Sequence, residues 1–291
     1  MNKLLKTLIF DGQLSLSVLD TTEMVNDAIK IHGLSATAAA ALGRTMTVAT
    51  YMASGLKSDK DRLSITVAGN GPCGKITVCG NGELFMRGSV ENGKADLPQR
   101  ADGKLDVGGA VGRDGTLTVI KDLHMKEPYV GTIDLLGGEI AEDVASYFVE
   151  SEQIPTACAL GVLVDRDQSV KSAGGYLIQL MPGAGEDTIA KVEGGVMAAG
   201  PVSAILERND DPEALLRTVM SDFDLKILET CPVSYKCYCS RQRVERALIS
   251  LGRSELEQML AEQGGCQLTC QFCDAVYDFS ADDLRALIAG L

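Results

Sequence analysis

Apolar and polar residues alternate in short runs along the first 183 residues of the chain. Such alternation, as in LSITVAG, KITVCG and TLTVI, is typical of strands that bury one face. The runs are bounded by dipeptides that accept a positive φ, namely Asp11-Gly12, Asn70-Gly71, Asn81-Gly82 and Asp114-Gly115. Dipeptides of this kind close tight turns between neighbouring strands. The pattern therefore predicts antiparallel hairpins.

Helices are expected between these strands. The stretch from Ser35 to Leu56, SATAAAALGRTMTVATYMASGL, is rich in alanine and lacks proline, which favours a helix. A second helix is expected over EIAEDVASYFVESEQ. Because the helices come in blocks and do not alternate strictly with strands, residues 1–183 are predicted to form an α+β domain of antiparallel sheets and packed helices.

A helical linker is predicted over residues 184–230. Apolar residues recur there at helical spacing, at Ile189, Val192, Val196 and Met197, and we expect them to form one face that docks on a neighbouring surface. Gly194-Gly195 interrupts this helix with residues that each cost about 1 kcal/mol relative to alanine. Residues 186–230 also carry ten acids and four bases. The linker should be helical but only marginally stable unless its apolar face is docked.

The pattern changes again in residues 231–291, which we predict to be a small separate domain. Ser240 is placed to cap one helix, Ser254 and Glu257 have the spacing of a capping box, and Ser280 is placed to cap a last helix. Between them, CQLTCQFCDAVYDF has the pattern of a hairpin.

The net charge disfavours two classes of partner. Forty acidic and twenty-seven basic residues give a formal charge of -13, which repels nucleic acid and anionic lipid. No apolar run approaches the length of a membrane span, and Asp11 interrupts the first apolar stretch before a signal peptide develops. We expect a cytoplasmic protein with no membrane and no nucleic-acid partner.

The nine cysteines are unevenly distributed. Six of them fall within 43 residues, and four of these form two close pairs, Cys237-Tyr238-Cys239 and Cys270-Gln271-Phe272-Cys273. Zinc prefers four tetrahedral ligands, and each close pair supplies two thiolates from one tight turn. The spacing therefore predicts one zinc ion on Cys237, Cys239, Cys270 and Cys273. A disulfide between residues separated by one position is strained, so the first pair suits a labile bond better than a permanent one.

The other cysteines carry weaker signals. Cys73, Cys79 and Cys158 lie in or beside apolar runs and are interpreted as buried apolar residues. For Cys231 and Cys266 the sequence leaves two interpretations open. They either have no role at the zinc site or serve as spare thiols that exchange with the zinc ligands when metal leaves.

No catalytic site is predicted. Residues 69–75, GNGPCGK, match the glycine spacing of phosphate-binding loops, but the following KITVCG has the pattern of a strand, whereas phosphate binding needs a helix amino terminus. His32 and His124 are the chain's two histidines, they lie far apart in sequence, and neither occurs in the sequence context of a serine nucleophile.

The residues around the cysteine pairs, SYKCYCSRQRVERALISLG and LTCQFCDAVYDFSADDL, resemble the heat shock protein 33 family, also called 33 kDa chaperonins. Further segments extend the resemblance over nearly the whole chain: TTEMVNDA, AAALGRTMT, KLDVGGAVGRDGTLTVIKDL, YFVESEQIP and AGGYLIQLMPGA.

The resemblance implies a redox-regulated, ATP-independent holdase, not an enzyme, that protects unfolding proteins from aggregation under oxidative stress. It implies a reduced, zinc-bound form that is inactive, and activation by the disulfides Cys237–Cys239 and Cys270–Cys273, zinc release, linker unfolding and formation of a homodimer. The face with Ile189, Val192, Val196 and Met197 is our candidate for client binding. Two alternative functions remain, a thiol oxidoreductase that uses Cys270-x-x-Cys273 and a zinc-ribbon interaction module. Residues 231–291 carry six bases and eight acids, so they lack the basic surface with which a zinc ribbon would bind nucleic acid.

Overall fold

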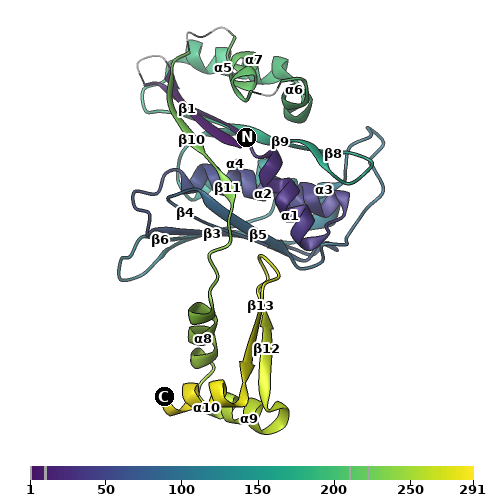
Figure 1. The fold of residues 1–291 in the computed structure, drawn as a ribbon. Helices are drawn as coiled ribbons and strands as arrows, with labels where there is room; N and C mark the ends of the chain where they lie inside the picture. The colour runs from purple at the N-terminus through teal and green to yellow at the C-terminus, as the bar shows by residue number, and fades with distance from the viewer. Residues whose placement is uncertain (1, 10–11, 210, 222, 224) are drawn as a thin grey trace. The chain divides into compact units, whose positions relative to one another are not determined.

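The structure is a computed structural model that describes residues 2–9, 12–209, 211–221, 223 and 225–291 (Figure 1). The chain divides into two compact units, Met1–Lys236 and Cys237–Leu291. The linker expected at residues 184–230 lies in the first unit, and so do residues 231–236, because they continue a strand that is hydrogen-bonded into that unit.

The first unit contains two sheets. One has the order β10-β1-β2-β9-β8, with all neighbours antiparallel: β1 Lys3–Ile9, β2 Leu14–Asp20, β8 Thr156–Val164, β9 Val170–Leu180 and β10 Ile227–Pro232. The other has the order β11-β5-β4-β3-β6-β7: β3 Arg62–Gly69, β4 Lys75–Asn81, β5 Phe85–Val90, β6 Gly115–Asp122, β7 Tyr129–Asp134 and β11 Ser234–Tyr235. Its pairs are antiparallel except β11 with β5, which is parallel.

Alternation along the strands follows the sequence pattern. In β3, Leu63, Ile65 and Val67 are buried, while the residues between them are half-buried. The hairpins expected at Asn70-Gly71 and Asn81-Gly82 are confirmed, since β3 pairs with β4 and β4 with β5. β1 and β2 also pair, although Asp11 of their turn lies outside the described residues.

The hairpin expected at Asp114-Gly115 is wrong. This dipeptide leads from a short helix, α3 (Val107–Val111), into β6, and β6 pairs with β3 from much earlier in the chain. Turn residues alone do not reveal which strands become neighbours, because the connection here passes through a helix.

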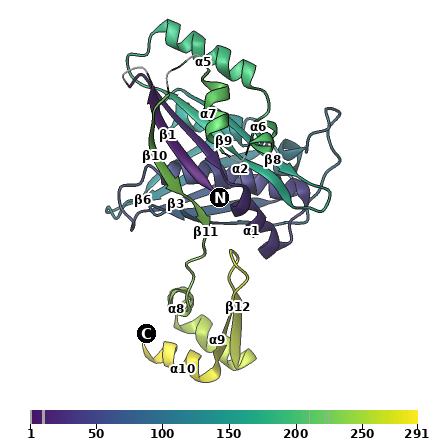
Figure 2. The ribbon, with the colours of Figure 1, turned by 45° about the horizontal axis from the view of Figure 1, so that its top comes forward.

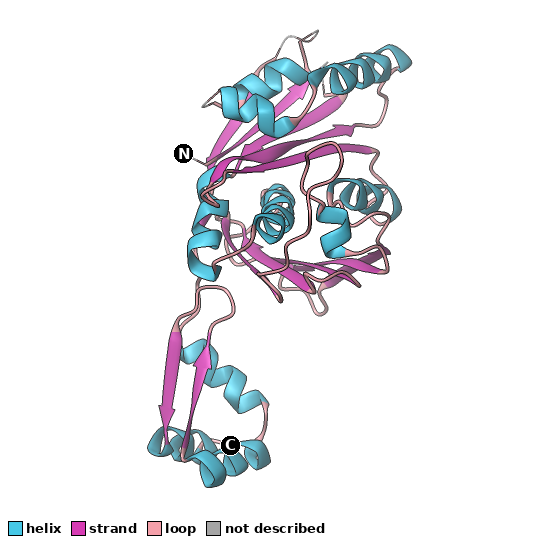
Figure 3. Cartoon of the chain, turned by 90° about the vertical axis from the view of Figure 1, so that its right-hand side faces the viewer, coloured by secondary structure: helices cyan, strands magenta, loops and turns pink. Residues whose placement is uncertain are grey.

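A layer of helices lies between the two sheets: α1 (Thr22–His32), α2 (Ala36–Ala53), α3 and α4 (Ala141–Glu150) (Figure 3). The alanine-rich helix is confirmed as α2, and Ser35 caps it by accepting a hydrogen bond from the Ala38 N–H. Its small side chains let the helix pack against both sheets. α4 confirms the second expected helix. The α+β class is therefore confirmed.

The linker forms three helices on the opposite face of the first sheet: α5 (Glu186–Ala199), α6 (Val202–Arg208) and α7 (Glu213–Val219) (Figures 2 and 3). Their apolar residues share one cluster with the strands beneath, which contains Leu14, Leu16, Val18, Tyr176, Ile178, Val192, Val202, Ile205, Leu206, Leu215, Leu216 and Val219. The outer face of this sheet is thus apolar as well, and the helices cover it.

Gly194 and Gly195 differ in their surroundings. A Cβ on Gly195 would lie 2.1 Å from the carbonyl oxygen of Val219 in α7, whereas a Cβ on Gly194 would meet nothing within 4 Å. Gly195 therefore permits the close approach of α5 to α7, and the pair of glycines is not simply a weak point of the helix.

The second unit contains α8 (Arg241–Ser250), α9 (Arg253–Gln263), the hairpin β12 (Gly265–Thr269) and β13 (Val276–Ser280), and α10 (Ala281–Ala289). Ser240 and Ser280 cap α8 and α10 as predicted. The capping box at Ser254 is wrong, because α9 begins at Arg253 with Gly252 as its cap.

Candidate metal centre

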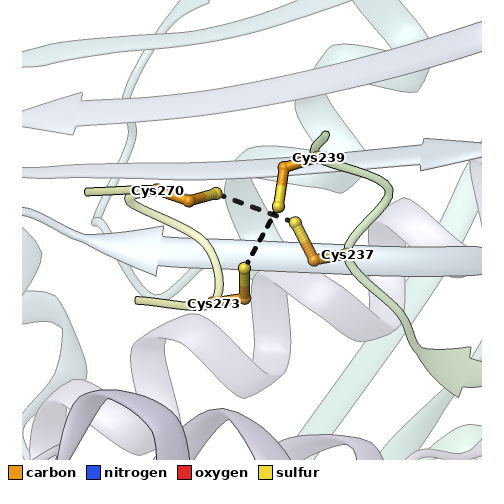
Figure 4. Close-up of side chains that lie close together, drawn as sticks. All are labelled: Cys237, Cys239, Cys270 and Cys273. Atoms are coloured by element: carbon orange, nitrogen blue, oxygen red, sulfur yellow. Dashed lines mark hydrogen bonds between the residues drawn. The ribbon is translucent and has the colours of Figure 1, made fainter. Parts of the chain in front are cut away.

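The two cysteine pairs are carried by two segments of the second unit. Cys237 and Cys239 lie on the stretch that precedes α8, and Cys270 and Cys273 lie on the turn between β12 and β13 (Figure 4). The capped start of α8 fixes the first stretch, and the paired strands fix the second. Residues more than thirty positions apart are thereby brought together.

The four sulfur atoms form a compact cluster, all within 4.8 Å of one another. The Sγ atoms of Cys237 and Cys270 are 3.8 Å apart, and those of Cys239 and Cys273 are 3.4 Å apart (Figure 4). Four sulfurs bound tetrahedrally at a Zn–S distance of about 2.3 Å would be separated by about 3.8 Å. The residues predicted as ligands therefore fit a tetrahedral metal ion such as zinc.

The turn between the strands is shaped to present its two sulfurs. The N–H groups of Cys273 and Asp274 donate to the carbonyl of Cys270, and Asp274 adopts a positive φ of 56°. The backbone N–H groups of Phe272 and Ala275 point at the sulfurs of Cys270 and Cys273 respectively. N–H donors of this kind stabilise thiolate charge and orient metal ligands.

The electrostatics of the cluster favour a bound cation. Burial raises the pKa of the Cys270 and Cys273 thiols, and hydrogen bonds with the neighbouring cysteines raise the pKa of Cys273 further. Four thiolates so close together repel one another, so a divalent cation is needed to keep all four deprotonated.

One hydroxyl group also reaches the cluster. Tyr277 on β13 donates to the Cys239 sulfur at 3.0 Å. This bond, followed by burial and by the charge of the neighbouring sulfurs, raises the pKa of Tyr277 to about 12, so the hydroxyl keeps its proton at neutral pH. Sequence reasoning missed this residue. The one feature of the sequence that could have indicated it is its position on the predicted strand that follows the second cysteine pair.

The apolar core of this unit is small. Its buried members are Leu248, Leu256, Phe279 and Leu284. Arg241 adds three contacts to this core. Its guanidinium lies over the Phe279 ring, donates a hydrogen bond to the Asp278 carbonyl at 2.7 Å and forms an ion pair with Asp283 at 3.0 Å. Such a core rarely holds so short a chain by itself, so a metal ion would supply much of the folding free energy.

Five other cysteines lie outside the cluster. Cys73 is fully buried, while Cys158 and Cys79 are half-buried on β8 and β4. Cys231 lies on β10 in the first unit and donates to Glu229 at 3.2 Å, whereas Cys266 lies on β12 and pairs with Phe279. Neither belongs to the group of four sulfurs.

We expect Cys73 to react at least about 100-fold more slowly with iodoacetamide in the native protein than in urea at pH 8. Burial raises its pKa to about 11 and that of Cys158 to about 12, so little thiolate is present. Mass spectrometry of the labelled peptides measures the rates. Native labelling of Cys73 as fast as that of the half-buried Cys266 would contradict this.

The four residues of the predicted linker face do not share one environment. Val192 is buried and Val196 packs beside it on the first sheet, while Ile189 is half-buried. The expectation is wrong for Met197, which is 86% exposed. At 100° per residue, Met197 lies about 140° around the helix from Val192, beyond the reach of the docked face.

Within the part of the chain that the structure describes, the remaining sequence motifs do not form a further site. Residues 70–74 form the turn between β3 and β4, so GNGPCGK has no helix amino terminus after it. His32 contacts the Gly88 carbonyl and Tyr235, and His124 lies beside Asp122. Across the described ranges, no single helix has the length and apolar character of a membrane span; α5 and α6 reach it only as a pair bent by 68°.

Comparison with known proteins agrees with these observations. A family model described as Hsp33 protein matches residues 2–280. The 33 kDa chaperonin of Acetivibrio thermocellus is 46% identical over 92% of this chain and 90% of its own length. That of Shouchella clausii is 43% identical, with coverages of 97% and 96%. The crystal structure of the 33 kDa chaperonin (heat shock protein 33 homolog) of Thermotoga maritima superposes with a TM-score of 0.90 at 34% identity, over 99% of this chain and 98% of that one. The resemblance seen in the sequence is confirmed, and the chain belongs to the Hsp33 family.

Proposed function

We propose that this member of a chaperone family is an ATP-independent holdase that is switched on by oxidation. The observation that carries the proposal is the cluster of four sulfurs in a unit whose own core has four buried apolar residues. When bound, zinc would hold the sulfurs as thiolates and link the two segments that carry them. Oxidation removes the ligands, and the unit then loses most of what keeps it folded.

The proposed chemistry consumes a peroxide. A cysteine sulfur attacks one oxygen, the O–O bond breaks, and a sulfenic acid and hydroxide form. A second cysteine sulfur then displaces hydroxide from the sulfenic sulfur, which closes a disulfide. We propose the pairs Cys237–Cys239 and Cys270–Cys273. Close sulfur contacts also run between the pairs, from Cys237 to Cys270 and from Cys239 to Cys273, so peptide mapping of the oxidised protein is needed to identify the bonds.

The client-binding surface is proposed to become available when the linker undocks. Helices α5 to α7 cover apolar side chains of β2 and β9, among them Leu16 and Ile178. Undocking would expose this sheet face together with Val192 and Val196 of the linker. Ile189 and the already exposed Met197 would flank it. Unfolded proteins, which expose apolar segments, would bind there, and such a surface also favours a homodimer of the oxidised form.

The proposal that the chaperone works without ATP is supported by the loop GNGPCGK of the first unit. Its glycine spacing is that of a phosphate-binding loop, but it forms a turn between two strands and is not followed by a helix amino terminus. We also propose a cytoplasmic location, where thiols stay reduced until oxidative stress, and no catalytic turnover.

The decisive test measures zinc content and the suppression of citrate synthase aggregation in the same samples, reduced and oxidised, with and without ATP. We expect about one zinc per chain and little protection when reduced, then zinc loss and strong protection after peroxide, independent of ATP. Strongest protection by the reduced, zinc-loaded protein would refute the switch. Catalytic reduction of insulin would instead support the oxidoreductase alternative.

A further inference from the structure

Tyr277 connects the two halves of the metal centre. Its ring packs against the small core of the second unit, and its backbone is paired with Leu268 in the hairpin. Both contacts hold the side chain in place, and its hydroxyl reaches the sulfur of Cys239 at 3.0 Å. The donor and the acceptor lie on different segments, 38 residues apart in sequence.

The donors to the sulfurs of Cys270 and Cys273 are of a different kind. Cys270 and Cys273 receive backbone N–H groups from their own turn, so these hydrogen bonds persist for as long as the turn itself. The bond from Tyr277 exists only while the hairpin and the Cys237–Cys239 stretch are held together. Cys239 therefore has a donor that local unfolding can remove.

We propose that Tyr277 is a positioning residue that slows the oxidation of Cys239 by donating a hydrogen bond to its sulfur. This inference rests on the proposed function, since it concerns the rate of that oxidation. A donor withdraws charge from a thiolate, and a less basic sulfur is a poorer nucleophile toward the peroxide O–O bond. The bond also strengthens metal binding, as partners of metal ligands generally do.

The test uses the full chain with Tyr277→Phe, which keeps the ring and removes the hydroxyl. Reduced protein with zinc in slight excess is exposed to hydrogen peroxide and quenched by alkylation at intervals. Mass spectrometry then follows the loss of each thiol. Trypsin separates the two pairs, because Lys236 and Arg241 flank Cys237 and Cys239. Without this donor the Cys239 sulfur keeps more negative charge, so Cys239 should react about threefold faster in the variant.

Cys270 and Cys273 serve as internal controls, because their backbone donors are unchanged. Tyr129→Phe is the matched control variant, since it removes a hydroxyl bonded to Ser151 in the first unit. Chelator competition adds a second measurement, in which zinc affinity should fall about tenfold in Tyr277→Phe. Equal Cys239 rates in wild type and Tyr277→Phe, with zinc present in both, would overturn the role of Tyr277 alone. A wild-type protein without zinc would overturn the proposed function as well.

Discussion

Cys270→Ser is expected to unfold residues 237–291 while the two sheets of the first unit and the helices between them stay folded. Structural zinc in small domains contributes about 10–16 kcal/mol of apparent binding free energy, far more than a core of four buried apolar residues supplies. Removing one of four sulfurs should therefore remove most of the folding free energy of this unit. Hydrogen exchange should become fast throughout α8 to α10, and trypsin should cut at Arg243 and Arg246 within α8.

The two sheets and the helices between them should keep their protection in this variant, because they share a separate core, whereas the linker helices α5 to α7 should lose theirs if the proposed function holds. Cys266→Ser is the matched control, since it replaces a half-buried cysteine of the same unit that lies outside the cluster. It should retain about one zinc per chain and resist trypsin. If Cys270→Ser kept α8 to α10 protected, folding of the second unit would not depend on a metal ion bound by the four cysteines.

Gly195→Ala is expected to undock α5, whereas Gly194→Ala on the same helix should hold it more firmly. The new Cβ at position 195 would lie 2.1 Å from the Val219 carbonyl oxygen, which is backbone and has little room to yield. Overpacking of this kind costs about 1–3 kcal/mol. Protection of α5 against hydrogen exchange should then fall by about 5- to 150-fold.

At position 194 the added methyl group meets nothing within 4 Å, so the substitution should stabilise α5 by up to about 1 kcal/mol through helix propensity. The two variants differ by one position and should move exchange rates in opposite directions. If linker release exposes the binding surface, reduced Gly195→Ala should suppress aggregation without oxidant, and Gly194→Ala should need more oxidant than wild type. Equal exchange rates in the two variants would contradict this account of α5.

Features set by nearby residues were predictable from the sequence. Asn70-Gly71 marks a real hairpin because both residues tolerate the turn, and Ser240 and Ser280 mark real helix starts because their hydroxyls accept backbone N–H groups. The gathering of four sulfurs was predictable because two close pairs suit one tetrahedral ion.

Features that depend on distant partners were not predictable. Apolar residues of α5 cover a wide arc, and only the position of the first sheet decides that Val192 is buried while Met197 is exposed. The requirement for Gly195 depends on how α7 packs against α5, and α6 separates these two helices in the sequence. The hydrogen bond from Tyr277 to Cys239 likewise depends on how two segments meet.

Residues 227–235 are hydrogen-bonded to both sheets, through β10 on β1 and β11 on β5. These hydrogen bonds determine where the chain can be truncated. A fragment that ends at residue 183 would lack β10 and β11, so β1 and β5 would become unpaired edge strands. It would also lack α5 to α7, so the apolar outer face of the first sheet would be exposed. Such a fragment would aggregate with itself, so a stable minimal domain has to extend to Lys236.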